Sequence, residues 1–141
     1  MTRLITLLVV TILLALGLIH VYWGLGTRNA STAVIPEVEG RPAFTPSRLS
    51  TLAVAVALFM AAGLVAAAGR LLGDPLASPI VRILTFVLGA VFVARAIGDF
   101  RLVGLFKRVR ASRFGRLDTW VYTPLCLVLG VAVLFVAYHD V

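Results

Sequence analysis

Four long runs of apolar residues alternate along the chain with shorter polar segments. The runs cover residues 4–26, 49–68, 79–98 and 119–138. A helix needs about 20 apolar residues to cross a hydrocarbon core roughly 30 Å thick, and each run is close to that length. The pattern therefore predicts an all-α integral membrane protein, a four-helix bundle in which residues 1–141 form a single four-span domain.

The composition agrees with a membrane protein and excludes several kinds of site. Apolar residues make up 61% of the chain and charged residues 13%, with a mean hydropathy of +1.06. The single cysteine, Cys126, excludes an internal disulfide, and within a span it is expected to behave as a small hydrophobe. His20 and His139 fall at opposite ends of the predicted bundle, so they cannot ligate one haem. We expect no metal and no cofactor.

A cleaved signal peptide is the alternative interpretation of the first run. Arg3 precedes the run and small residues follow it at positions 30–33. However, the run is longer than the apolar part of a signal peptide and ends in Tyr22 and Trp23, which favours a retained span.

The connections and one proline affect the boundaries of the helices. The segment 27–48 contains three prolines, which favours extended and turn conformations, and residues 73–75 predict a tight connection. In the last run we expect a helix that begins at Asp118 and kinks near Pro124, rather than a shorter helix capped by Thr123.

Two surface patterns predict packing. Ala53, Ala57 and Ala61 recur every four residues, as expected for close helix packing in lipid with the second helix central to the bundle. The alternative is that alanine is only an apolar filler.

The third connection also has a helical pattern, typical of a segment in the headgroup layer that attracts anionic lipid. It sets Leu102, Leu105, Phe106 and Val109 opposite Arg101 and Arg108.

The distribution of Lys and Arg predicts the orientation. The first and third connections and their flanks hold nine of these residues, and the opposite side holds three. Because basic loops stay in the cytoplasm, both termini are expected outside it. This rule also accounts for the net charge of +7, so nucleic acid is not an expected partner.

Polar residues within or next to the spans form the candidate ligand-binding site. They are expected at one membrane side, at the cytoplasmic interface: His20, Trp23, Arg95, Asp99 and Asp118. Arg95 and Asp99 are four residues apart, a spacing that allows an ion pair on one helical face. In this hypothesis Arg95 holds an anionic group, Asp99 orients Arg95, and Trp23 supplies an apolar wall.

Each of these residues also has a structural interpretation. Trp23, with the other interfacial aromatic residues, fits an aromatic belt, and Arg95 can extend its stem to the headgroups. His20 can be hydrogen-bonded between helices, and Asp118 can cap a helix.

Three functional hypotheses follow. The first is binding of a small amphiphile or lipid headgroup in this pocket. The second is a membrane-embedded enzyme acting on a lipid-soluble substrate, such as an isoprenoid or sterol-like ring, with His20 as general acid or base and Asp99 fixing its tautomer. The third is a scaffold or accessory subunit with a homo-oligomeric or membrane-protein partner. No catalytic residue can be assigned, and a non-enzymatic role with membrane lipids as partners is preferred.

Three motifs carry a family resemblance. They read HVYWG at residues 20–24, RAIGDFRLVGLFK at 95–107 and DTWVYTPLC at 118–126. Together they resemble a family of short bacterial four-span membrane proteins, the domain of unknown function 3995, over nearly the whole chain. The resemblance implies a multi-pass protein of the bacterial plasma membrane, the inner membrane, and it implies no activity.

Overall fold

The computed structural model describes residues 1–26, 34–73 and 78–139. Its long helices are α1 (Thr2–Leu25), α2 (Arg48–Ala68), α3 (Pro79–Ile97) and α5 (Thr123–His139), and two short strands pair as β1 (Glu37–Val38) and β2 (Arg41–Pro42). The chain enters α5 through α4 (Arg113–Leu117) and a π-helical turn, η2 (Asp118–Tyr122), as one continuous helix. Four helices of the described chain are thus long and apolar enough to cross a membrane, which confirms the predicted fold class.

Serine and glycine residues set most of the helix ends. The Oγ atoms of Ser47, Ser78 and Ser112 accept hydrogen bonds from backbone N–H groups in the first turns of α2, α3 and α4. Such N-caps satisfy donors that have no partner within the helix. Glycines follow α1, α2 and α3 directly. The first three helices consequently begin and end within two residues of the predicted ranges.

The last helix begins earlier than expected. It starts at Arg113, capped by Ser112, so the predicted start at Asp118 is wrong. The turn before Pro124 is π-helical, and in it the N–H of Thr123 donates to the carbonyl of Asp118. Since Pro124 has no N–H and crowds the preceding turn, the wider turn accommodates the proline without ending the helix.

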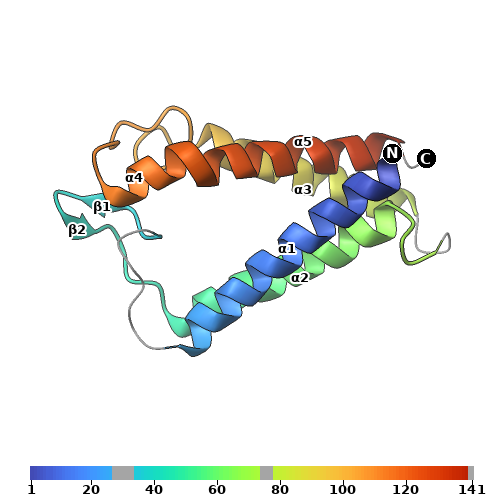
Figure 1. Ribbon diagram of the computed structural model, residues 1–141, viewed down its shortest axis with the longest axis horizontal. Coiled ribbons are helices and arrows are strands. Elements are labelled where there is room, and N and C mark those ends of the chain that lie inside the picture. Colours follow the sequence, from blue (N-terminus) through green and yellow to red (C-terminus); the bar gives the residue numbers. More distant parts are fainter. Residues whose placement is uncertain (27–33, 74–77, 140–141) are drawn as a thin grey trace.

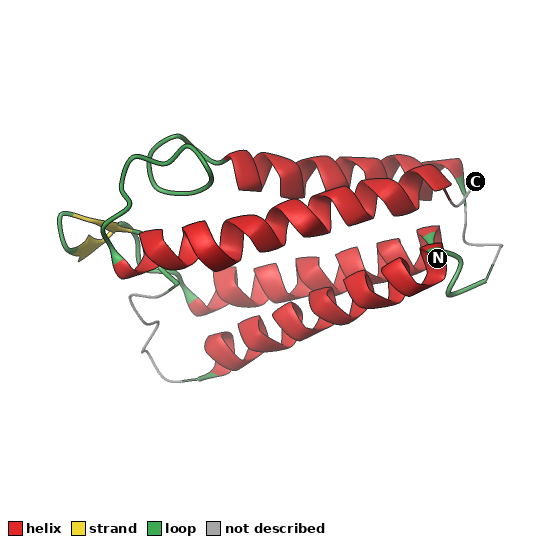
Figure 2. Cartoon of the chain, turned by 45° about the horizontal axis from the view of Figure 1, so that its top comes forward, coloured by secondary structure: helices red, strands yellow, loops and turns green. Residues whose placement is uncertain are grey.

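The helices form two hairpins, α1 with α2 and α3 with α5. Gly17 of α1 lies under the ring of Phe59 of α2, and Gly130 of α5 lies against the backbone of α3 at Val93. These glycines allow the close helix approach that stabilises packing in lipid. Figure 1 shows the hairpins meeting at the end that holds both termini and diverging toward the other end, and Figure 2 shows the same pairing from another direction.

The core lies where the two hairpins meet. It consists of buried residues of α1, α2 and α5: Val9, Leu13, Ala61, Ala62, Val65, Ala68, Leu129, Val133 and Val136. Ala61 is part of it, but Ala53 and Ala57 are exposed. The predicted alanine stripe therefore holds only at Ala61, and α2 packs mainly on α1 instead of in the centre of the bundle.

The first and third connections lie at the end opposite the termini, which we call the basic end (Figure 1). In the first connection, residues 34–47 hold the β1–β2 hairpin, whose turn contains Gly40 at φ +76°. This agrees with the predicted extended and turn conformations. Residues 27–33 of this connection and residues 74–77 of the second lie outside the described residues, and so do the small residues at 30–33 and most of the tight connection predicted at 73–75.

Candidate functional site

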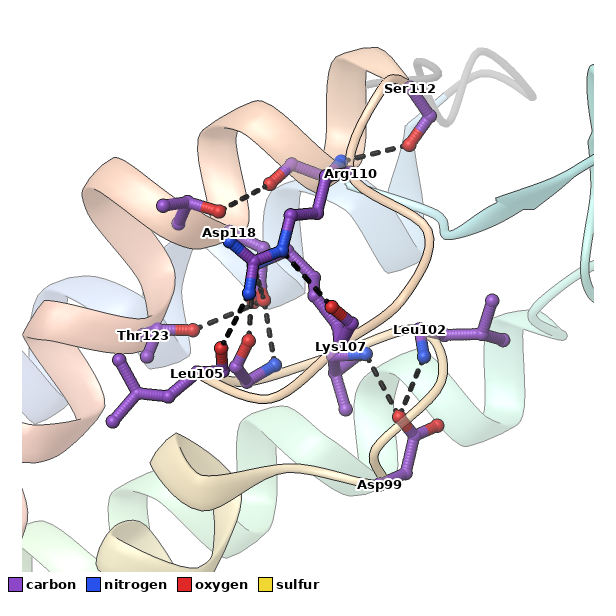
Figure 3. A network of polar contacts seen from close by, with 12 residues as sticks. Asp99, Leu102, Leu105, Lys107, Arg110, Ser112, Asp118 and Thr123 are labelled. Atoms are coloured by element: carbon purple, nitrogen blue, oxygen red, sulfur yellow. Dashed lines mark hydrogen bonds and ion pairs between the residues drawn. The ribbon is translucent and has the colours of Figure 1, made fainter.

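A buried carboxylate organises the basic end of the α3–α5 hairpin. Asp118, in the π-helical turn, has no exposed surface. Its Oδ1 accepts a hydrogen bond from Arg95 Nη2 at 2.9 Å, and its Oδ2 lies 3.1 Å from Lys107 Nζ. Oδ2 also accepts from the N–H of Gly104 at 2.8 Å and from Thr123 Oγ1 at 3.1 Å. We call these five residues the Asp118 cluster. Figure 3 labels Lys107, Asp118 and Thr123 of this cluster.

The burial of the Asp118 cluster explains why it has so many donors. A carboxylate removed from water is stable only if opposite charges and hydrogen bonds replace its hydration. The side chain of Lys107 is 2% exposed and that of Arg95 is 34% exposed, so one cation is enclosed and the other reaches the surface. Two cations against one carboxylate leave the cluster with an excess positive charge.

The loop between α3 and α4 folds back to reach Asp118. Gly98 and Gly104 have φ values of +90° and +89°, a region that favours glycine. A side chain on Gly98 would collide with the carbonyl of Val103, because Val103 and Gly104 pass Gly98 at backbone contact. The N–H of Leu105 then donates to the carbonyl of Ala96 at 2.9 Å. Lys107 is thereby placed over Asp118, and its Nζ also donates to the carbonyl of Gly104 at 3.1 Å.

Asp99 stabilises this loop and does not orient Arg95. Its Oδ1 accepts hydrogen bonds from the N–H groups of Arg101, Leu102 and Val103 at 2.7–3.0 Å. Figure 3 labels Asp99 and Leu102 of this set. The expected Arg95–Asp99 pair is wrong because α3 ends at Ile97, which takes Asp99 off the helical face of Arg95. Desolvation raises the pKa of Asp99, but the hydrogen bonds from Val103, Arg101 and Leu102 outweigh it, so its pKa lies below the usual value.

The third connection is irregular instead of helical. Residues 99–112 contain no helix, and in place of one apolar face Leu102 and Val109 are half-buried while Leu105 and Phe106 are exposed. The two glycines and the Asp99 hydrogen bonds divert the backbone from the helical path. Helical periodicity alone could not predict this irregular conformation, because the path of the loop depends on contacts with Asp118, which lies on another element.

His20 and Trp23 form a separate group on α1. The Nδ1 of His20 lies 2.8 Å from the carbonyl of Leu16 on the same helix, so it donates that bond and leaves Nε2 as an acceptor in the neutral ring. Its ring meets that of Trp23 edge-on, with centroids 5.1 Å apart. No hydrogen bond, ion pair or ring contact links this pair to the Asp118 cluster within the described ranges. The alternative interpretation expected His20 to be hydrogen-bonded between helices, but its hydrogen bond to Leu16 lies within α1.

Of the five predicted site residues, the structure brings Arg95 and Asp118 into direct contact. Asp118 lies within the last helix and not at its start, so it is not the N-cap that the alternative interpretation expected. Ser112 is the N-cap of this helix. The sequence analysis missed Lys107, because it was counted with the other cations of its loop. It also missed Gly104, and the sequence feature that could have indicated Gly104 is a second glycine, Gly98, in the same loop. Within the described part of the chain, no three His, Cys, Asp or Glu side chains are grouped to hold a metal ion.

Comparison with known proteins gives the family and no activity. No curated protein and no solved structure matches the chain significantly. The family model described as "Protein of unknown function (DUF3995)" matches residues 13–133, which include all five predicted site residues and the whole Asp118 cluster. The chain therefore belongs to the DUF3995 family.

Proposed function

We propose that the protein binds the anionic headgroup of a small amphiphile or lipid at Arg95. The main observation that supports this proposal is the unequal burial of Arg95 and Lys107, the two cations that contact Asp118. Lys107 is enclosed, whereas a third of the Arg95 side chain is exposed while Asp118 fixes its guanidinium group. A guanidinium held in place by a buried carboxylate is pre-organised to bind a phosphate or carboxylate oxygen.

The hydrogen-bond inventory supports the same role. Nη1 of Arg95 is buried and makes no hydrogen bond to any described residue. A buried guanidinium nitrogen without an acceptor is costly, and an anionic oxygen that reached it would satisfy it. The excess positive charge of the Asp118 cluster also favours the binding of an anion.

The site also faces a suitable environment. The third connection and α4 hold five exposed arginines: Arg101, Arg108, Arg110, Arg113 and Arg116. Near an anionic leaflet each cation contributes on the order of 1 kcal/mol of attraction. In the enzyme hypothesis Asp99 would fix the tautomer of His20, but Asp99 bonds its own loop and His20 bonds Leu16. Headgroup binding is therefore the function that the geometry supports best.

Native mass spectrometry of the protein released from nanodiscs of phosphatidylglycerol and phosphatidylcholine tests the proposal. Wild type is expected to retain phosphatidylglycerol, and Arg95→Gln is expected to lose it. Arg95→Lys keeps the positive charge next to Asp118 but lacks the planar guanidinium group, so it should retain an intermediate amount of phosphatidylglycerol. The matched control is Arg82→Gln, since Arg82 lies on the same helix toward the other end and stacks over Phe86. Equal phosphatidylglycerol retention by wild type and folded Arg95→Gln would refute the proposal.

A further inference from the structure

The loop that covers Asp118 carries exposed aromatic side chains. Phe100 and Phe106 are 59% and 58% exposed, and their rings stack with centroids 6.0 Å apart. Leu105 beside them is 48% exposed. Phe100 has a φ of +62°, which is rare for a bulky residue. The backbone is thus held in an unfavourable conformation that presents two rings outward, where the protein itself covers less than half of them.

The position of this loop places the rings at the depth of the helix ends. The N–H of Leu105 bonds to Ala96 in the last turn of α3, and Gly104 bonds to Asp118 in the π-helical turn. Both helices are long and apolar enough to cross a membrane. The segment next to Phe106 therefore packs back against the last turn of α3 and the π-helical turn before α5, rather than extending away from the helices.

The charges around the rings are complementary to an anionic leaflet. Arg101 and Arg108 flank the aromatic pair, and both are exposed. Among residues 99–112 the one acidic side chain is Asp99, whose Oδ1 is occupied by three backbone N–H groups. Aromatic rings next to exposed arginines are the combination that favours the headgroup and acyl boundary of a bilayer.

From these observations we infer that residues 99–110 form a membrane-interfacial element that inserts Phe100 and Phe106 into an anionic leaflet. Arg101 and Arg108 hold the adjacent headgroups. Arg110 fixes the loop from within, because its Nε and Nη2 donate to the carbonyls of Lys107 and Leu105 at 3.1 and 3.2 Å. This surface is separate from the headgroup site proposed at Arg95, and its insertion does not require that site to be filled.

Site-directed spin labelling of the full chain tests the inference. Cys126 is the only cysteine, so Cys126→Ala gives a background in which Phe100→Cys, Phe106→Cys or Ala111→Cys carries the nitroxide. Power saturation in vesicles of phosphatidylglycerol and phosphatidylcholine compares accessibility to oxygen, which partitions into lipid, with accessibility to a water-soluble nickel chelate. We expect oxygen to dominate at positions 100 and 106 and the chelate to dominate at the exposed control position 111.

Three results would overturn the inference. Chelate accessibility at position 106 equal to that at 111 would place the loop in water. Inaccessibility to both reagents would show that a protein surface covers the rings. Equal insertion in pure phosphatidylcholine would remove the role of anionic lipid. Repeating the measurement with Arg95→Gln separates the two proposals, because insertion at position 106 should persist when headgroup binding at Arg95 is lost.

Discussion

At the scale of single residues, Asp118 connects more parts of the basic end than any other described side chain. It joins α3 through Arg95, the intervening loop through Gly104 and Lys107, and its own helix through Thr123. A buried ionic group of this kind adds little net stability compared with well-packed apolar residues. We expect its role to be specificity, because this arrangement of the loop satisfies both the carboxylate and the enclosed lysine.

Asp118→Ala is expected to destabilise the protein by about 3–5 kcal/mol, because it leaves the buried charge of Lys107 without its partner. Arg95 loses the same partner but can turn toward solvent. The check is thermal unfolding in detergent, followed by the helical circular dichroism signal. The double variant Asp118→Ala/Lys107→Met removes the stranded charge and should recover most of the lost stability. A double variant no more stable than Asp118→Ala would show that the charge is not the cause.

At the scale of elements, the four helices were predictable from the sequence apart from the start of the last one, and the loop over Asp118 was not. Helix boundaries depend on local features, such as the apolar run of α3 between the cap Ser78 and the following Gly98. The loop depends on long-range contacts, in which Lys107 is buried because Asp118 is buried beneath it. A sequence pattern assigns Lys107 to the surface, since isolated charges are rarely enclosed. Arg95 and Asp118 were both named as candidate site residues, but their direct pairing was not foreseen.

The Asp99 hydrogen bonds predict a pH-dependent loop. The pKa of Asp99 is lowered in the folded protein, because three backbone N–H groups outweigh its desolvation. The stabilisation of the loop by the carboxylate is therefore fully present above the unfolded-chain pKa of about 3.9 and is lost as the pH falls through the lower folded value. Hydrogen exchange at Arg101, Leu102 and Val103, corrected for intrinsic rates, should show decreasing protection between about pH 5 and pH 2.

Asp99→Asn is the matched control for this pH dependence. The amide oxygen can still accept hydrogen bonds, but it carries no charge to titrate. Protection of the three amides should therefore be lower than in wild type at neutral pH and independent of pH in the acidic range. If wild type and Asp99→Asn lose protection in parallel on acidification, another titrating group controls the loop.

At the scale of the whole molecule, two hairpins share a core near the termini and separate toward the basic end (Figure 1). Except for Leu129, the core residues of α1, α2 and α5 lie in the halves of these helices nearest the termini. Large apolar side chains such as Leu18, Val91 and Val128 are exposed instead of forming a second core. In a bilayer this exposure carries no penalty, because lipid is as apolar as the protein interior. The polar groups of the basic end are thus held by hairpin packing and by the Asp118 cluster.

The arrangement of the charges predicts how the bundle lies in its membrane. Four membrane-length helices in series put the first and third connections on one side, and this side and its flanks have nine Lys and Arg residues against three on the other. The basic end should therefore face the cytoplasm, because short loops rich in Lys and Arg are retained there. In a Cys126→Ala background, a membrane-impermeant maleimide should label Leu72→Cys, at the opposite end, in intact cells. It should label Ala111→Cys only after the membrane is permeabilised. Both side chains are exposed, so the reverse labelling pattern would invert the orientation and place the headgroup site on the outer face.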